Sequence, residues 1–219
     1  MSLFRLKLPL LVSALAFAGV THAATTLLSE GFDDGSSALA GQGWLIDNQS
    51  TPGGSTTWFE PGAGAVIPAY SGSSYMAANY HSSGDGGTVD NWLISPTFST
   101  ATAGYVTLYL IGGNEVIGDI LSIDTLKFGF SNGSATTSDF GMGSTVTAPA
   151  GWTAYTFAYA AGGAGSVGRF AIEYTGDWAV ADYVGVDSLS ITAVPEPATW
   201  ALFALGAAAI VARRRRSAR

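Results

Sequence analysis

The chain has 219 residues, no cysteine and a charged fraction of only 11%, which excludes disulfides and thiolate metal sites and allows one domain or at most two small ones. Seven of the nine basic residues lie at the two ends, so residues 24–194 contain fifteen acidic residues but only Lys127 and Arg169 as bases, a net charge of −13. So acidic a body excludes nucleic acid as a partner, because neutralising phosphates requires a basic surface.

Residues 1–23 have the pattern of a secretory signal peptide. Arg5 and Lys7 supply a positive start, the apolar run 8–20 follows, and small residues precede Ala24 at the position where signal peptidase would cut. An uncleaved membrane anchor is the alternative, which the short run disfavours. We expect an exported protein whose mature chain begins at Ala24.

Residues 24–194 are expected to form one all-β domain. Apolar residues alternate with a period of two rather than 3.6, and no window indicates an amphipathic helix. Clusters rich in glycine and small polar residues, at 83–87, 112–114, 131–133 and 162–163, are read as turns. Many short strands with such turns are typical of a sandwich or barrel, and about 170 residues suit a jelly roll. The expected strands are 25–32, 92–94, 105–111, 126–130, 155–159, 170–174 and 183–191.

The last expected strand contains an irregularity. Val184 and Val186 share one face, whereas the next apolar residues, Leu189 and Ile191, are out of phase by one position. Such a slip exposes the core face of a strand unless a β-bulge absorbs it. We expect a bulge at Asp187–Ser188 that turns the Asp187 carboxylate to one edge of the sandwich.

The residues give little support for catalysis. His81 is the only histidine left after signal removal, it lies in a turn-rich loop, and no Gly-x-Ser-x-Gly nucleophile motif accompanies it. Zinc catalysis needs several histidine or cysteine ligands. A glycosidase carboxylate pair stays open, because fifteen acids allow many pairs, although neither Glu115 nor Glu173 falls in a recognisable motif. We expect a protein that is not an enzyme.

Aromatic residues in or near loops suggest sugar binding, because aromatic faces stack on sugar rings. Trp58 and Trp178 are the candidates for exposed, ligand-binding rings. The alternative for a tryptophan beside a strand is a place in the core, which we expect for Trp44 and Trp92 and consider for Trp152. The wider set of loop aromatics comprises Phe59, Tyr70, Tyr75, Tyr80 and Trp152.

The last 25 residues, 195–219, have three parts in a fixed order. A rigid Pro-Glu-Pro is followed by the uncharged run 198–212, which is shorter than the roughly 20 residues that cross a bilayer untilted, and then by a basic cluster that favours the cytoplasmic side. The first part is Pro195, Glu196 and Pro197, and the last contains Arg213, Arg214, Arg215 and Arg216.

This order of parts resembles a PEP-CTERM sorting signal. The resemblance implies a Gram-negative bacterium, transient anchoring in the inner membrane through a transmembrane helix at 198–212, and recognition and cleavage near the motif by an exosortase. It further implies delivery to the cell surface or the exopolysaccharide matrix. The alternative is a permanent single-span anchor, since fifteen apolar residues form a marginal span.

A second resemblance covers most of residues 25–192. Five short motifs in order resemble the choice-of-anchor J domain, which is similar to the cleaved-adhesin modules of bacterial surface proteases and more distantly to MAM domains. The motifs are Glu30–Phe32, Gly43–Trp44, Asp90–Pro96, Arg169–Tyr174 and Tyr183–Ile191.

The second resemblance implies a galactose-binding-like jelly-roll β-sandwich and a role in adhesion or carbohydrate binding. It also implies one structural calcium ion, held by Glu30, Asp33 and Asp187 where the first and last strands meet, since calcium prefers carboxylate and carbonyl oxygens. The alternative is that Asp33 only stabilises a turn.

Together these features predict an exported surface or matrix protein. Signal peptidase and exosortase would be its partners during export, and an extracellular polysaccharide or surface glycan its partner afterwards. A secreted carbohydrate-active enzyme and a purely structural matrix protein are the alternatives.

Overall fold

The computed structural model describes residues 23–62, 65–113, 116–117, 120–194, 206–208, 210–211 and 213–214. The segment Ala23–Glu196 forms one compact unit. Residues 206–208, 210–211 and 213–214 are helical. Within the described part of the chain, no helix has the length and apolar character needed to cross a bilayer.

The predicted signal peptide and sorting segment are therefore almost entirely outside the described residues. This holds for 1–22 and 195–205, and for Arg215 and Arg216 in the basic cluster. Their boundaries stay predictions.

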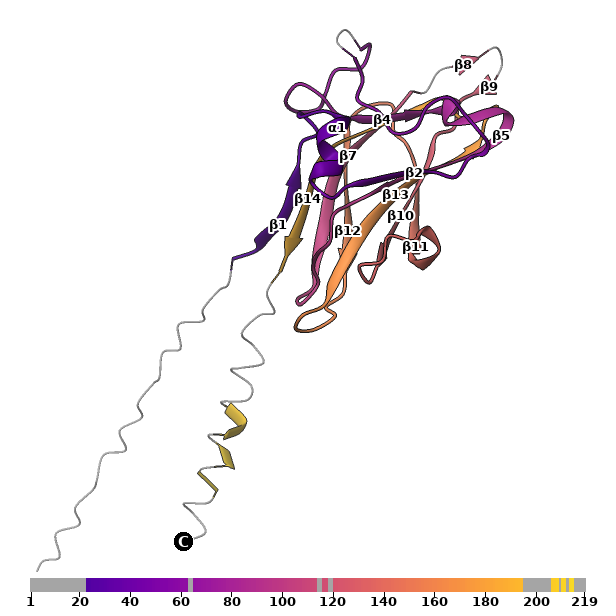
Figure 1. Ribbon diagram of the computed structural model, residues 1–219. Coiled ribbons are helices and arrows are strands. Elements are labelled where there is room, and N and C mark those ends of the chain that lie inside the picture. Colours follow the sequence, from indigo (N-terminus) through magenta and orange to yellow (C-terminus); the bar gives the residue numbers. More distant parts are fainter. Residues whose placement is uncertain are drawn as a thin grey trace, which may run out of the picture. The chain divides into compact units, whose positions relative to one another are not determined.

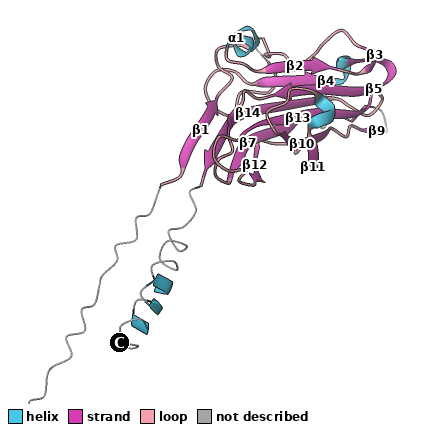
Figure 2. Cartoon of the chain, turned by 60° about the horizontal axis from the view of Figure 1, so that its bottom comes forward, coloured by secondary structure: helices cyan, strands magenta, loops and turns pink. Residues whose placement is uncertain are grey.

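Two antiparallel sheets pack face to face in the unit Ala23–Glu196 (Figures 1 and 2). The first sheet has the order β1-β14-β7-β12, with β4 also paired to β14; the second has the order β11-β10-β13-β5-β2, with β3 on β5 and β6 on β13. The strands of the first sheet are β1 (Thr25–Glu30), β4 (Met76–Asn79), β7 (Gly104–Gly112), β12 (Thr153–Tyr159) and β14 (Tyr183–Ala193). Those of the second are β2 (Leu45–Asn48), β3 (Thr51–Gly53), β5 (Ser83–Ile94), β6 (Phe98–Ser99), β10 (Thr125–Ser131), β11 (Gly141–Thr147) and β13 (Val167–Asp177).

The remaining described elements of this unit are short. A two-stranded ribbon joins β8 (Val116–Ile117) and β9 (Ile120–Leu121). One six-residue helix, α1 (Ser36–Gly41), follows β1, and 3₁₀ turns occur at η1 (Tyr80–Ser82) and η2 (Thr137–Asp139). The sequence did not indicate α1, because a helix of fewer than two turns has too few residues to show a 3.6-residue pattern.

The prediction of an all-β jelly-roll sandwich is confirmed. Each of the expected strands overlaps an observed one, but the assignment of 83–87 to a turn is wrong, because these residues form the first half of β5. The glycines there allow close approach rather than a turn: a Cβ at Gly87 would lie 2.5 Å from the carbonyl oxygen of Thr51 in β3.

The core lies between the two sheets and contains the residues that the alternation places inward. In β7, Val106, Leu108 and Leu110 are fully buried, and they face inward residues of the second sheet such as Phe128 and Ile172. Burying each such side chain contributes about 1.5–3 kcal/mol, so this apolar layer is the main source of stability in a domain without disulfides.

A buried carboxylate fixes the segment that leads into β14. The Tyr174 hydroxyl donates to Asp124 Oδ1 at 2.6 Å, and the backbone N–H of Asp182 donates to the same oxygen at 2.8 Å. Burial raises the pKa of Asp124, and these hydrogen bonds oppose that rise. The carboxylate thereby holds Asp182, and with it the start of β14, against the end of the core.

Both basic residues of the sandwich are engaged by the protein itself. Lys127 Nζ lies 3.0 Å from Glu173 Oε1. Arg169 donates from Nη1 to the Ser95 carbonyl at 2.7 Å and from Nε to the Gly133 carbonyl at 3.2 Å. Arg169 therefore ties neighbouring loops to β13 through backbone carbonyls.

Candidate ligand-binding site

The predicted bulge in β14 is present. The register between β14 and β7 shifts between Asp187 and Ser190, and Ser188 adopts a left-handed conformation with φ 51°. The predicted direction of the Asp187 carboxylate is wrong, however. β14 lies inside the first sheet, between β7 on one side and β1 and β4 on the other, so Asp187 projects from the outer face of an interior strand rather than from an edge.

The Asp187 carboxylate is buried because a loop covers it. Its side chain has no exposed surface, and Oδ2 accepts the backbone N–H of Ser71 at 3.1 Å while Oδ1 accepts the Ser188 hydroxyl at 3.2 Å. Burial raises the pKa of Asp187, and the hydrogen bonds from Ser71 and Ser188 partly offset it. The carboxylate thus anchors the loop to the outer face of the sheet.

Asp33 holds the next residues of the same loop, so we call residues 70–74 the anchored turn. Asp33 Oδ1 accepts the N–H groups of Ser73 at 2.6 Å and Ser74 at 3.1 Å, and these bonds lower the pKa of Asp33. Gly72 has φ +67°, and a Cβ there would collide with the Asp33 carboxylate. Two acidic side chains from distant parts of the chain therefore fix one turn.

Aromatic rings gather around the anchored turn. Tyr70 stacks on Tyr109 of β7, with ring centroids 3.5 Å apart and planes inclined by 17°. Trp152 meets the edges of Tyr70 and Tyr75, at 6.4 and 5.2 Å, and its Nε1 donates to the Pro68 carbonyl at 2.9 Å. Tyr70 keeps 44% of its surface exposed, so this cluster presents an aromatic face to solvent.

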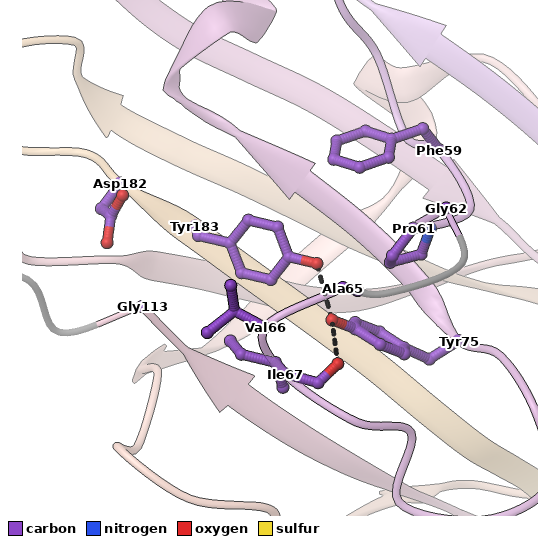
Figure 3. Close-up of a pocket in the computed structure, with 10 residues that line it drawn as sticks. All are labelled: Phe59, Pro61, Gly62, Ala65, Val66, Ile67, Tyr75, Gly113, Asp182 and Tyr183. Carbon is purple, nitrogen blue, oxygen red and sulfur yellow. Dashed lines mark hydrogen bonds between the residues drawn. The ribbon is translucent and has the colours of Figure 1, made fainter.

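A cavity of about 440 Å³ lies beside this cluster (Figure 3). Phe59 and Tyr183 form two of its walls, with ring centroids 6.4 Å apart and planes inclined by 69°, and Tyr75 lies at its base, only 2% exposed. A volume of this size fits one or two sugar rings, and the mixture of apolar surface with a few polar groups is typical of ligand sites. The lining residues are Phe59, Pro61, Gly62, Ala65, Val66, Ile67, Tyr75, Gly113, Asp182 and Tyr183.

The two tyrosine hydroxyls in the cavity form a directed chain. The Tyr75 hydroxyl donates to the Ile67 carbonyl at 3.2 Å and lies 2.7 Å from the Tyr183 hydroxyl (Figure 3). Because a phenol has one hydrogen, the bond to Ile67 leaves Tyr75 as acceptor and Tyr183 as donor. Burial raises the pKa of both tyrosines, so both stay protonated around neutral pH.

The expectation that Trp58 is an exposed ligand-binding ring is wrong. Trp58 is 2% exposed, packs in the main core, and donates from Nε1 to the Asn91 carbonyl at 3.1 Å. Its neighbour Phe59 points the other way, since successive residues of an extended segment project to opposite sides, and it is Phe59 that lines the cavity. Trp178 is half-buried against Tyr80, and its role in ligand binding stays a prediction.

The three carboxylates predicted to hold calcium already accept backbone N–H groups of the protein. Strands β1 and β14 are paired, with Glu30 opposite Leu189, and Glu30 Oε1 accepts the N–H of Phe32 at 2.8 Å. Within the described ranges no three His, Cys, Asp or Glu side chains are placed to hold a metal ion. The calcium site of Glu30, Asp33 and Asp187 stays a prediction.

Two of the residues weighed for catalysis, His81 and Glu173, do not line the cavity. His81 is exposed in η1 with its ring against Tyr80, and Glu173 is paired with Lys127 on the second sheet. Glu115 is outside the described residues.

Sequence reasoning missed Tyr183 and Asp182 as site residues. Tyr183 begins the strand that the alternation identified, and Asp182 directly precedes it. Nothing in the local sequence shows whether residues at this position line a cavity or a bare surface. Their pairing with Tyr75 and Phe59 is non-local, so only the fold reveals it.

Comparison with known proteins supports both predicted resemblances. The profile of the PEP-CTERM protein-sorting motif matches residues 193–216, so the motif begins at the last residue of β14. This motif marks an exported surface protein of the exosortase-processed kind. No protein of curated function matches the sequence.

Among solved structures, the sandwich is similar to cleaved adhesin domains of Lys-gingipain from Porphyromonas gingivalis. The K3 domain has a TM-score of 0.59 at 17% identity, covering 78% of this chain and 99% of that domain. The K1 domain has a TM-score of 0.58 at 20% identity, covering 77% and 98%. At these identities the similarity shows a shared fold.

The anchored turn gives a prediction for pH-dependent stability. Asp33→Ala removes the acceptor of the Ser73 and Ser74 amides, so the melting midpoint at pH 7 should fall by a few degrees. The pKa of Asp33 is lowered in the folded protein, so its contribution is present above the unfolded pKa and is lost as the pH falls through the folded pKa. The difference between wild type and variant should therefore shrink below about pH 4.

The control for this prediction is Asp34→Ala, which removes the neighbouring exposed carboxylate. Its melting midpoint should stay near that of the wild type across the same pH range. Equal midpoints for the wild type and Asp33→Ala at pH 7 would show that Asp33 does not hold the turn.

Proposed function

We propose that the protein is a non-enzymatic, exported surface protein whose sandwich binds a glycan of the cell surface or extracellular matrix in the cavity beside the anchored turn. The observation that carries the proposal is the aromatic wall of that cavity. The rings of Phe59 and Tyr183 line the cavity nearly perpendicular to each other, and the Tyr183 hydroxyl supplies a hydrogen-bonding group beside Tyr75. Rings that stack on sugar faces, with nearby groups that bind hydroxyls, are the usual elements of sugar recognition.

The route to the surface follows from the sorting motif. We propose that signal peptidase removes residues 1–23 and that the segment 198–212 halts the chain in the inner membrane with the arginines on the cytoplasmic side. Exosortase would then recognise Pro195, Glu196 and Pro197. The match of the sorting motif at 193–216 supports this order of events.

Substitution of Phe59 tests the glycan site. The backbone N–H and carbonyl of Phe59 pair with Ala77 at 2.8 Å in both directions, so Phe59→Ala removes the ring and keeps the pairing. On a glycan array, the domain of residues 24–194, a compact unit with its own core, should bind a subset of oligomers. The variant should bind the best of them about twofold to twelvefold more weakly, since an aromatic contact contributes about 0.5–1.5 kcal/mol.

Val167→Ala is the matched control, because Val167 is a large exposed apolar residue on β13 and does not line the cavity. It should bind like the wild type. If no glycan on the array binds, a purely structural matrix protein explains the protein better. If Phe59→Ala and the wild type bind equally well, the glycan site lies elsewhere.

We also propose one structural calcium ion at Glu30, Asp33 and Asp187. The pairing of β1 with β14 supports it, as does the anchored turn, which Asp33 and Asp187 both bind. Several of these carboxylate oxygens already accept backbone N–H groups, so the ion would have to share or replace some of those hydrogen bonds.

Thermal melting with and without a chelator decides the calcium proposal. A ligand that binds only the folded state raises stability by RT ln(1 + [L]/Kd), so excess calcium should raise the midpoint above that in EGTA, and magnesium should do so less. Equal melting midpoints in calcium and in EGTA would contradict the calcium proposal.

A further inference from the structure

The polar side chains that line the cavity are those of Tyr75, Tyr183 and Asp182. The single hydrogen of Tyr183 is directed to Tyr75, and that of Tyr75 to the Ile67 carbonyl. The Tyr183 oxygen therefore faces a ligand with its lone pairs. Asp182 adds a carboxylate, beside Gly113 at one side of the cavity (Figure 3). A ligand that donates hydrogen bonds fits these side-chain groups.

The charge of the whole domain favours the same kind of ligand. Residues 24–194 have a net charge of −13, and their only two basic side chains are Lys127 and Arg169. The first is paired with Glu173 and the second donates to backbone carbonyls. Neither is on the cavity wall. An anionic polysaccharide would meet like charge without a cation to neutralise it, whereas a cationic one is attracted.

We propose that the cavity binds a cationic amino sugar, with its ammonium group at Asp182 and its ring against Phe59 and Tyr183. This inference rests on the proposed glycan association and specifies the chemical class of the glycan. An ammonium group has three donors and no acceptor, which matches the acceptors present. It is also attracted to the faces of tyrosine and phenylalanine rings.

The two rings and the carboxylate act on different parts of such a ligand. Phe59 and Tyr183 stand nearly perpendicular at 6.4 Å, so they form a corner that contacts the sugar on two sides. Asp182 also interacts with neighbouring groups of the protein, and a carboxylate with about four acceptor positions can serve both purposes. The rings would hold any sugar of suitable shape, and Asp182 would select the charged one.

The test compares three soluble oligomers by calorimetry on the domain of residues 24–194. A glucosamine tetramer and an N-acetylglucosamine tetramer share one backbone and differ in charge, and a galacturonate tetramer is anionic. The glucosamine tetramer should bind at least about tenfold more tightly than its acetylated form, and the galacturonate tetramer should not bind. Raising the salt concentration from about 50 mM to about 500 mM should weaken only the glucosamine tetramer.

Asp182→Asn removes the charge and keeps the shape, and its backbone N–H to Asp124 is unaffected. The variant should lose the preference for glucosamine and keep the weaker binding of the acetylated tetramer. Asp85→Asn, a change of the same charge at an exposed position outside the cavity, should keep the preference. If Asp182→Asn does not fold, the glucosamine preference of the wild type and its salt dependence still test the amino-sugar assignment.

The outcomes separate this inference from the proposed function. Equal or tighter binding of the acetylated or galacturonate tetramer would overturn the amino-sugar assignment and leave glycan association standing. A glucosamine preference that survives in Asp182→Asn would overturn the role of Asp182. If no glycan binds, including on the array, both proposals fail together.

Discussion

One buried carboxylate determines how the outer face of the first sheet is covered. Asp187 projects outward from an interior strand, where a charge shielded from water is unfavourable unless hydrogen-bond donors surround it. The backbone of the anchored turn supplies a donor through Ser71, and Asp33 holds the two residues that follow. The loop is consequently held by two carboxylates, in addition to the stacking of Tyr70 on Tyr109.

The cavity is a consequence of that attachment. The loop that precedes the turn runs from Phe59 to Tyr70, and its far end is fixed where Tyr70 stacks on Tyr109. Its near end is fixed where Phe59 pairs with Ala77. Between these ends, residues 61–62 and 65–67 line the same cavity as Tyr183 at the start of β14, so Tyr183 forms a cavity wall rather than a bare surface. Asp124, on the other side, holds the backbone of Asp182 in place.

The sequence predicts the sandwich well because alternation is a local property. It also predicts the bulge, since the slip between Val186 and Leu189 can be read without the fold. The sequence reasoning fails at 83–87, where the glycines allow close packing of strands instead of forming a turn. It also fails at Trp58, because adjacent residues of an extended segment face opposite sides, and Phe59 rather than Trp58 lines the cavity. The surroundings of the Asp187 carboxylate cannot be predicted from the sequence, because they depend on a loop that lies more than 100 residues earlier in the chain.

Native-state hydrogen exchange of the domain measures whether Asp33 and Asp187 hold the anchored turn against the sheet. The amides of Ser71, Ser73 and Ser74 lie in a loop, where exchange is ordinarily fast. We predict slow exchange for all three, because each donates to Asp187 or Asp33. Exchange of these three amides as fast as that of an unprotected loop would show that the two carboxylates do not hold the turn.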